Sequence, residues 1–316
     1  METDKIKDKV EKISENISRV IVGKKKEIEL LLIALVCGGH VLIEDNPGMG
    51  KTMLANTLAK SINSHFQRIQ FTPDLLPSDL TGINYYNQKM NEFVFKPGPV
   101  FSNIILADEI NRATPRTQSA LLESMEEKQV TIDNVTHRLE LPFMVIATQN
   151  PIETTGTFPL PEAQLDRFLI KLSIGYPDLA ESVDILTRFK NSSPLETIGP
   201  VAEKGDILEM QREYSNVEVH NDILEYIVNI CEETRKHKDV LLGVSPRASQ
   251  ALLKTVMAKA AISGRSFVVP DDVKYMCKNV LAHRMILKGM ETIRGGVNEV
   301  LDKILDKVEV PTEKGI

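Results

Sequence analysis

The chain of 316 residues is expected to fold as an α/β domain followed by a smaller, all-α domain. Continuous apolar runs of strand length recur in its first half and alternate with helical patterns, which is typical of a parallel sheet covered on both faces. A glycine-bearing turn joins the first of these runs to a helix. Beyond Pro177, helical patterns follow one another without a convincing strand, which indicates a separate domain. The expected domains are residues 1–176 and 177–316.

The N-terminal residues carry an amphipathic helical pattern. Its apolar side chains recur at spacings of three and four: Ile6, Val10, Ile13, Ile17 and Ile21. Such a stripe could bind a partner as a coiled coil, but packing on the domain's own body is favoured. A second helical pattern spans residues 28–35 and ends at Gly38-Gly39, because glycine suits a helix C-terminal cap. Residues 40–44 are the first expected strand.

Further strands are expected at residues 67–71, 103–107, 143–147 and 168–174. Together with the first strand they make a parallel sheet of about five strands. The expected helices of the second half are residues 179–190, 205–214, 221–236, 246–263 and 271–287.

Residues 45–52 nearly match the phosphate-binding pattern G-x-x-x-x-G-K-[ST]. Backbone N–H groups of such a turn, with the N-terminus of the following helix, form a cradle for polyphosphate. Lys51 is then placed to reach the β- and γ-phosphates of ATP, and the Thr52 hydroxyl to bind Mg²⁺. The alternative is a strand, a turn and a helix without a ligand, and the rest of the chain has to decide between the two.

Asp45 replaces the first glycine of the phosphate-binding pattern. Aspartate tolerates left-handed backbone better than most residues, so the turn can form. A carboxylate about 4 Å from a phosphate oxygen would cost on the order of 1 to 4 kcal/mol. The side chain of Asp45 must therefore point away from the nucleotide, or the nucleotide affinity is reduced.

Two carboxylates, Asp108 and Glu109, follow the apolar run of residues 104–107. Charges at the end of a buried strand need partners or a metal ion. Downstream of a phosphate loop, Asp108 is expected to hold ATP-bound Mg²⁺ together with Thr52, and Glu109 to polarise the attacking water. The alternative is an exposed strand end followed by a turn.

Three more polar residues are candidates for the same chemistry. Asn150 could orient a water or contact the γ-phosphate, although Asn followed by Pro is also a turn signal. Arg247 stands in the first turn of a helix, where a cation opposes the helix dipole unless it faces a phosphate. Arg167 either pairs with a carboxylate such as Asp166 or stabilises transferring phosphoryl charge in a neighbouring subunit.

Composition limits the compartment and the partners. The net charge of −6 and the pI of about 5.7 count mildly against holding nucleic acid through its phosphates. The three cysteines lack a metal or redox spacing, so buried free thiols are expected. The charged N-terminal residues are unlike a signal peptide, and no apolar run approaches membrane-spanning length. A cytoplasmic protein without membrane insertion is therefore expected.

Seven stretches are specific in combination: residues 39–44, 47–52, 107–113, 118–127, 147–151, 160–168 and 245–248. Through them the chain resembles the MoxR-type AAA+ ATPases over residues 21–285. The resemblance implies a P-loop AAA+ core of the α/β class with a five-stranded parallel sheet, followed by an all-α lid domain.

The resemblance also implies roles for single residues. Lys51 and Thr52 match the Walker A motif, Asp108 and Glu109 match Walker B, Asn150 resembles sensor 1, Arg167 the arginine finger and Arg247 sensor 2. Glu109, Asn150, Arg167 and Arg247 are thus the catalytic candidates, and Thr52 and Asp108 the Mg²⁺ ligands. The nucleotide-binding candidates are Val22 and Gly23, which resemble the hydrophobic seat of the adenine, and Asn46, Pro47, Gly48, Met49, Gly50, Lys51, Thr52 and Met53.

Relatives form ring hexamers with each ATP between two subunits, so Arg167 would act in trans. The implied function is Mg²⁺-dependent hydrolysis of ATP to ADP and phosphate, coupled to chaperone-like remodelling, assembly or cofactor insertion of protein clients. A partner with a von Willebrand factor A domain is common among relatives. Two family insertions, residues 71–100 and 128–141, face the pore in relatives and are candidates for client contact. Asp133-Asn134 between two β-prone runs predicts a hairpin in the second insertion.

Two alternatives remain open at this point. One is a nucleotide-gated binding scaffold that turns over slowly because Asp45 weakens the site. The other is a DNA-remodelling AAA+ motor, against which the acidic net charge argues.

Overall fold

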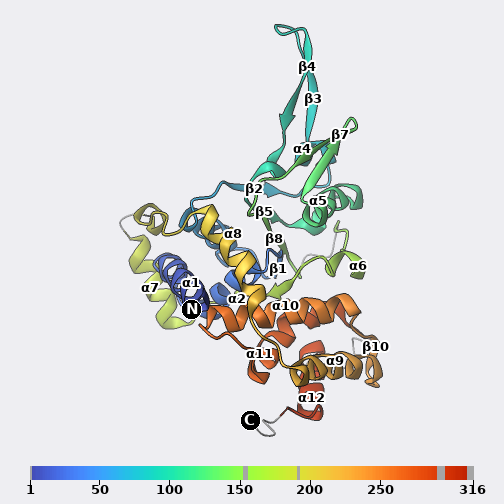
Figure 1. Ribbon diagram of the computed structural model, residues 1–316. Helices are drawn as coiled ribbons and strands as arrows, with labels where there is room; N and C mark the ends of the chain where they lie inside the picture. Colours follow the sequence, from blue (N-terminus) through green and yellow to red (C-terminus); the bar gives the residue numbers. More distant parts are fainter. Residues whose placement is uncertain (1, 152–155, 191–192, 290–295, 312–316) are drawn as a thin grey trace.

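A five-stranded parallel sheet lies at the centre of the molecule (Figure 1). This computed structural model describes residues 2–151, 156–190, 193–289 and 296–311. The sheet order is β2-β5-β8-β1-β9, and all neighbouring strands run parallel. The strands are β1 (Val41–Glu44), β2 (Phe66–Gln70), β5 (Ile104–Asp108), β8 (Met144–Gln149) and β9 (Ile170–Leu172). The predicted parallel sheet is confirmed.

The strands end together at one edge of the sheet, which we call the carboxyl edge. Gln70 pairs with Asp108 and Glu44 pairs with Gln149, so the last residues of neighbouring strands lie side by side. The loops that leave β1, β5 and β8 therefore start close together, as is usual for ligand sites of open α/β sheets. The opposite end of the strands, which begins at His40 before β1, is the amino edge.

Helices cover both faces of the sheet because the strand residues are apolar on both sides. The covering helices are α1 (Glu2–Ser18), α2 (Lys25–Val36), α3 (Lys51–Ser61) and α5 (Pro115–Glu127). The first three share one apolar cluster with Ile43 and Ile104, whereas α5 shares another with Leu42 and Ile105. The apolar stripe of α1 is buried in the first cluster, which confirms that this helix packs on the chain's own body.

Two hairpins project from the sheet (Figure 1). The longer one follows α4 (Pro77–Thr81) and consists of β3 (Gly82–Asn87) and β4 (Glu92–Pro97). The shorter one, β6 (Gln129–Ile132) and β7 (Val135–Arg138), turns at Asp133 and Asn134, whose φ angles are 48° and 66°. The second hairpin was predicted from these two turn residues, which favour such angles. The rings of Phe95 and His137 stack at 4.1 Å and join the two hairpins.

The second half is mainly helical, with α7 (Leu179–Phe189), α8 (Lys204–Glu213), α9 (Asn221–Lys236), α10 (Pro246–Ile262), α11 (Pro270–Leu281) and α12 (Gly296–Lys307). Short single-turn elements complete the described chain: η1 (Pro99–Phe101), η2 (Ile110–Arg112), α6 (Glu162–Leu165), η3 (Pro194–Thr197), η4 (Tyr214–Asn216) and η5 (Ala282–Arg284).

The expectation of a second half without strands is wrong in one detail. β10 (Val240–Leu242) and β11 (Ile286–Leu287) form a small antiparallel pair. The expected helix at 271–287 ends instead at Leu281, because η5 turns the chain toward β11. Strands of three and two residues are too short to show an alternating pattern, so they could not be predicted from hydrophobic periodicity.

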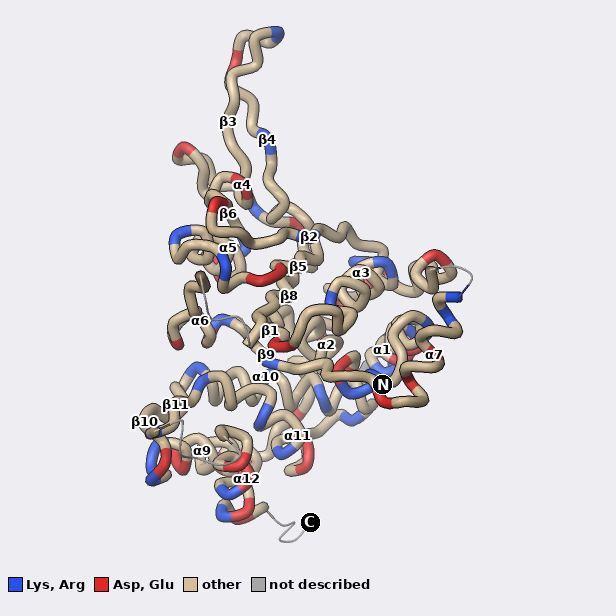
Figure 2. Tube along the Cα trace, turned by 180° about the vertical axis from the view of Figure 1, so that it is seen from behind, with Lys and Arg blue, Asp and Glu red and all other residues tan. Residues whose placement is uncertain are grey.

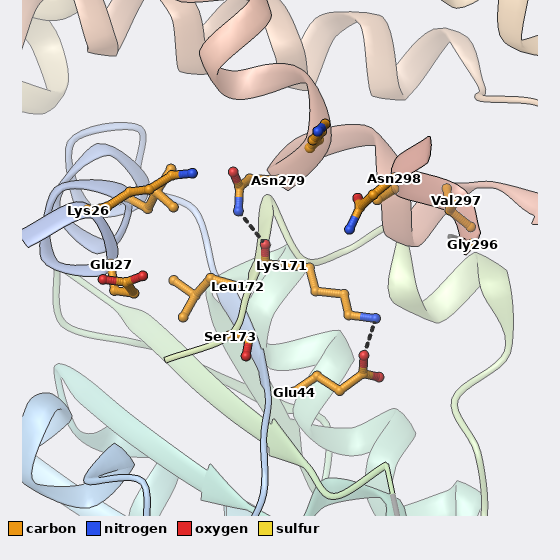
Figure 3. Close-up of a pocket in the computed structure, with 13 residues that line it drawn as sticks. Lys26, Glu27, Glu44, Lys171, Leu172, Ser173, Asn279, Gly296, Val297 and Asn298 are labelled. Atoms are coloured by element: carbon orange, nitrogen blue, oxygen red, sulfur yellow. Dashed lines mark hydrogen bonds and ion pairs between the residues drawn. The ribbon is translucent and has the colours of Figure 1, made fainter. Parts of the chain in front are cut away.

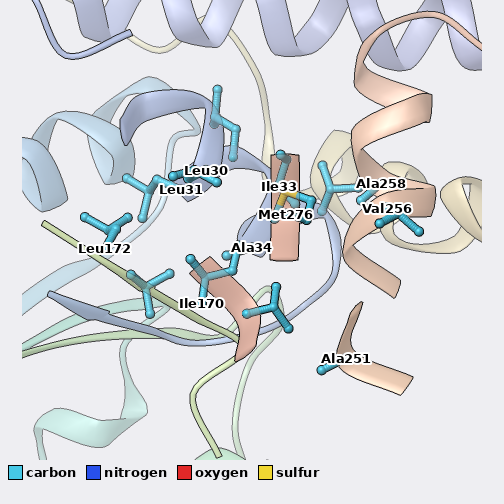
Figure 4. Close-up of a cluster of buried hydrophobic side chains, with 14 of the residues drawn as sticks. Leu30, Leu31, Ile33, Ala34, Ile170, Leu172, Ala251, Val256, Ala258 and Met276 are labelled. Carbon is cyan, nitrogen blue, oxygen red and sulfur yellow. The ribbon is translucent and has the colours of Figure 1, made fainter. Parts of the chain in front are cut away.

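The helical half packs directly on the sheet domain. Figure 4 shows side chains of α2, β9, α10 and α11 meeting in one apolar cluster, among them Ile33, Ile170, Val256 and Met276. One apolar core thus spans both halves of the chain, and the expected division at residue 176 stays a prediction. Within the described residues, no helix combines the length and the apolar character that crossing a bilayer requires.

Candidate functional site

The phosphate loop leaves β1 at the carboxyl edge and ends where α3 begins, at Lys51. Gly48 and Gly50 have φ angles of 83° and 81°, in the left-handed region that favours glycine. A Cβ atom built on either glycine would meet no heavy atom within 4 Å, so space beside the loop is open to a ligand. The loop therefore has the glycine conformations and the approach that a polyphosphate cradle needs.

The Asp45 carboxylate points away from the loop, toward the end of β9. It accepts hydrogen bonds from the Ser173 hydroxyl at 2.7 Å, from the Gly175 N–H at 3.3 Å and from the Ile174 N–H. Of the two outcomes expected for Asp45, this is the one in which its charge is turned away from the nucleotide. The aspartate fastens the phosphate loop to the neighbouring edge strand.

Lys51 and Thr52 occupy the first turn of α3. The Lys51 ammonium is buried and donates a hydrogen bond to the Asp45 carbonyl oxygen at 2.8 Å, across the mouth of the loop. Thr52 is exposed. Lys51 is therefore placed to replace its hydrogen bond to the Asp45 carbonyl by one to a phosphate oxygen when a nucleotide binds.

Asp108 ends β5 at the same edge and has partners on both carboxylate oxygens. Its Oδ1 accepts from the Thr148 hydroxyl at 2.7 Å, and its Oδ2 accepts from Arg68 at 2.7 and 3.1 Å. The Arg68 side chain is half-exposed, so this ion pair is weakly held. Mg²⁺ in nucleotide sites commonly takes one or two protein oxygens besides phosphates and waters. The carboxylate of Asp108 and the hydroxyl of the exposed Thr52 fit that donor set, and such an ion would neutralise phosphate charge.

Glu109 adopts a left-handed backbone, with φ 57° and ψ 50°. Non-glycine residues in this region are strained and cluster at functional sites. Its N–H donates to the Thr148 hydroxyl at 2.8 Å, which fixes the turn after β5. Its Oε2 accepts from Gln70 at 2.7 Å and lies 3.2 Å from Arg112 Nε. The Glu109 carboxylate is thus held by neighbours that a polarised water would have to replace.

Asn150 is buried directly after β8, whose last residue pairs with the last residue of β1. Lys51, Thr52, Asp108, Glu109 and Asn150 therefore all follow strands that end at the carboxyl edge. The fold brings these five predicted residues to one edge of the sheet.

Val22 and Gly23, the expected adenine seat, lie in the segment before α2 and close to the start of α7. Gly23 has φ 73°, and a Cβ built on it would collide with the Glu181 carboxylate. Lys24 donates to the Tyr176 carbonyl at 3.1 Å, and Asn46 donates to the Tyr176 hydroxyl at 3.1 Å. The segment before α2, the phosphate loop and the chain leaving β9 thus meet at one place.

A cavity of about 500 Å³ opens beside β9, between α2, α11 and α12 (Figure 3). Within it, Lys171 pairs with Glu44 at 2.6 Å, and Asn279 donates to the Lys171 carbonyl at 3.1 Å. No residue predicted for the site lines this cavity. The cavity borders the start of the phosphate loop through Glu44 and Ser173.

Arg167 and Arg247 lie at the opposite, amino edge. Both contact the Glu126 carboxylate, Arg167 at 3.2 Å and Arg247 at 3.1 Å. Both line a cavity of about 270 Å³ that also touches His40, at the amino end of β1. Arg247 is thus separated from the phosphate loop by the length of the strand. The seven predicted polar residues form two groups at opposite edges of the sheet.

Buried groups fix the amino edge. His40 Nε2 contacts the Met125 carbonyl at 3.0 Å while its Nδ1 accepts from the Val145 N–H at 3.0 Å. Burial lowers the pKa of His40 to about 4, so the ring stays neutral and keeps both bonds. Arg284 has its side chain only 4% exposed and binds Asp166 Oδ1 at 2.5 Å. Burial lowers the pKa of Arg284, and the Asp166 carboxylate opposes this shift.

Four of these partners were not predicted from the sequence: Arg68, Gln70, Glu126 and Arg284. Arg68 and Gln70 alternate with Ile69 along β2, which is a visible signal for one polar face. Glu126 and Arg284 gave no such signal, because their charged partners lie 41 or more residues away along the chain.

Comparison with known proteins agrees with this geometry. Residues 40–170 match the model of the ATPase family associated with various cellular activities (AAA), and residues 232–304 match an AAA lid domain. The chain is 52% identical to the protein YeaC of Bacillus subtilis over 96% of this chain and 95% of that protein. It is 40% identical to "Chaperone MoxR1" of Mycobacterium tuberculosis, over 93% of this chain and 80% of that protein.

A solved structure is also similar. It is that of a protein from Cytophaga hutchinsonii described as a "putative ATPase", with a TM-score of 0.92, 40% identity and coverage of 98% of this chain and 97% of that chain. The likeness extends over both the sheet domain and the helical half. The chain therefore belongs to the MoxR family of AAA+ ATPases.

Proposed function

We propose that this ATPase hydrolyses Mg²⁺-bound ATP at sites shared between neighbouring subunits of a ring, most simply a hexamer, and uses the energy to remodel protein clients. The observation that supports the shared site is the separation of the predicted residues. Lys51, Asp108 and Glu109 stand at the carboxyl edge, while Arg167 and Arg247 stand at the amino edge. A complete set of charges around one ATP then requires two chains.

Each residue has a proposed role in this scheme. Lys51 and the backbone N–H groups of Asn46 and of residues 48–51 bind the phosphates, and Thr52 and Asp108 hold Mg²⁺, which neutralises phosphate charge. Glu109 accepts the proton of the attacking water, and Asn150 orients that water. Arg167 and Arg247 of one chain approach the γ-phosphate bound by its neighbour. In the isolated chain Glu126 pairs with both arginines and keeps them at the surface.

The orientation of Asp45 bears on the scaffold alternative. That alternative rested on repulsion between the Asp45 carboxylate and the nucleotide. Because the carboxylate is bound at the end of β9, the repulsion has lost its basis. The acidic net charge still argues against the DNA-motor alternative.

The proposed clients are proteins, as the name of the mycobacterial relative suggests for that protein. The β3–β4 hairpin supports this choice, because large apolar side chains stand exposed on it, among them Met90 at 61% and Phe93 at 73%. Figure 2 shows few charged residues along this hairpin. A partner with a von Willebrand factor A domain and a cytoplasmic location stay predictions.

The role of Glu109 is tested by the substitution Glu109→Gln. The amide cannot accept the proton of the attacking water, so steady-state hydrolysis should fall about 10²- to 10⁴-fold. Binding of a fluorescent ATP analogue should remain, because no phosphate contact is lost. Glu123→Gln on the same domain is a matched control and should hydrolyse ATP like the wild type. Unchanged hydrolysis by Glu109→Gln would remove Glu109 from the mechanism.

A further inference from the structure

Arg284, a residue of the lid, donates five hydrogen bonds. It stands at the end of η5, after α11, and its side chain is 4% exposed. All its acceptors except the Val280 carbonyl belong to the segment 166–169. These acceptors are the Asp166 carboxylate at 2.5 Å, the Asp166 carbonyl at 3.2 Å, the Phe168 carbonyl at 2.8 Å and the Leu169 carbonyl at 3.3 Å.

The segment 166–169 contains Arg167. Arg284 binds the carbonyl groups on both sides of Arg167, those of Asp166 and Phe168. His283, the preceding lid residue, also contacts the Phe168 carbonyl, at 2.9 Å. The lid therefore fixes the backbone from which Arg167 projects.

The Asp166 carboxylate connects Arg284 to Arg247. Its Oδ1 binds Arg284, and its Oδ2 lies 3.9 Å from Arg247 Nε. Arg247 in turn shares the Glu126 carboxylate with Arg167. Arg284 is the member of this cluster that is almost completely removed from solvent, so it cannot itself reach a neighbouring chain.

We infer that Arg284 is a positioning residue for hydrolysis: it fixes Arg167 to the lid, so that Arg167 and Arg247 enter the neighbouring ATP site as one rigid pair. This inference rests on the proposed shared site. A planar guanidinium can bind several acceptors around a bend of the chain in one fixed geometry. Lysine keeps the charge but offers a single ammonium, so Arg284→Lys should loosen the segment 166–169 without leaving Asp166 unpaired.

Arg265→Lys is the matched control. Arg265 is another lid arginine and binds a buried carboxylate, that of Asp272, at 2.6 and 2.8 Å. It lies outside the cluster around Arg167. A loss that comes only from a weakened lid should be similar in the two variants.

The first measurement compares steady-state hydrolysis, binding of a fluorescent ATP analogue and the thermal midpoint of assembled full-length protein. We expect kcat of Arg284→Lys to fall about tenfold to a hundredfold, because small misplacements of a charge-stabilising group have effects of this size. Its ATP affinity should stay within about twofold of the wild type, since its own phosphate loop is intact. Equal kcat values for Arg284→Lys and Arg265→Lys would overturn the inference.

The second measurement mixes variants. Arg284→Lys retains an intact Glu109, and Glu109→Gln retains an intact pair of Arg167 and Arg247. A mixed ring therefore contains some sites in which Glu109 comes from the first variant and the arginine pair from the second. Hydrolysis should recover to the level of the reference mixture of Arg167→Ala and Glu109→Gln. Recovery in the reference mixture alone would overturn the positioning role of Arg284. Failure of the reference mixture as well would overturn the shared site and this inference with it.

If Arg284→Lys does not assemble, Asp166→Asn replaces it in both measurements. That substitution removes the charge that Arg284 binds and keeps the size of the side chain. The same loss of kcat and the same recovery are expected, and wild-type kcat would overturn the inference.

Discussion

At the residue scale, Asp45 shows how an unusual residue in a motif can serve the fold. Its carboxylate binds the Ser173 hydroxyl and two N–H groups at the end of β9. This strand is the neighbour of β1, which leads into Asp45. Chemistry alone left two outcomes for this residue: a carboxylate that points away from phosphate, or a reduced affinity for the nucleotide. The identity of its partners was out of reach, because Ser173 lies 128 residues further along the chain.

The substitution Asp45→Gly restores the usual motif residue and tests this account. It removes a buried acceptor and leaves the Ile174 N–H without its partner, which should lower the free energy of unfolding by about 1–3 kcal/mol. The affinity for ATP should not rise, because no repulsion is relieved. Urea unfolding and nucleotide titration measure the two quantities. An increase in affinity without a loss of stability would show that Asp45 acts on the nucleotide.

The carboxyl-edge residues were the most predictable part of the site. Lys51, Asp108 and Glu109 each stand directly after or beside a strand that is apparent from its apolar run, and parallel strands place such positions together. Glu126 was not predictable. It lies on a helix with two other acidic residues, Glu123 and Glu127, and its pairing with Arg167 and Arg247 depends on how the lid packs.

At the scale of elements, the two projecting hairpins differ in what the sequence says about them. Asp133-Asn134 marks the turn of β6–β7 with residues that tolerate positive φ, and the prediction was confirmed. In the β3–β4 hairpin the neighbouring residues Tyr85 and Tyr86 are both exposed, at 42% and 49%, so no buried face imposes an alternating pattern.

Replacing Tyr85, Tyr86 and Phe93 by serine tests whether this hairpin contacts clients. We expect basal hydrolysis to remain, because the hairpin lies away from the carboxyl edge, while stimulation of hydrolysis by unfolded casein should fall about fivefold or more. Leu241→Ser with Leu242→Ser, on the exposed part of β10, is the matched control and should retain the stimulation. Full stimulation of the hairpin variant would contradict client contact there.

At the scale of the whole molecule, the sheet, the α-helical half and their order in the chain were predictable from periodicity, and the structure confirms them. Their mutual packing was not. The apolar cluster that joins α2 and β9 to α10 and α11 is built from ordinary apolar residues, and their sequence does not indicate which helix packs on which strand. Only the folded chain shows that Arg247 consequently lies at the amino edge, far from its own phosphate loop.

Separated half-sites predict that hydrolysis depends on assembly. Specific activity of the wild-type chain should rise with protein concentration and level off where light scattering shows a completed ring. Arg167→Ala should assemble equally well, since its partner Glu126 is exposed, but should lack the rise in activity. A specific activity that is constant across the assembly transition would mean that each chain hydrolyses ATP alone.

The strand β9 gains a second meaning from its position. At its amino end the chain carries Arg167, and at its carboxyl end residues 173–175 bind Asp45 of the phosphate loop. Three residues of extended chain span only about 10 Å. In a ring, the same short strand would adjoin the phosphate loop of its own chain at one end and the nucleotide of the next chain at the other. Successive ATP sites around such a ring would then be connected through one short edge strand.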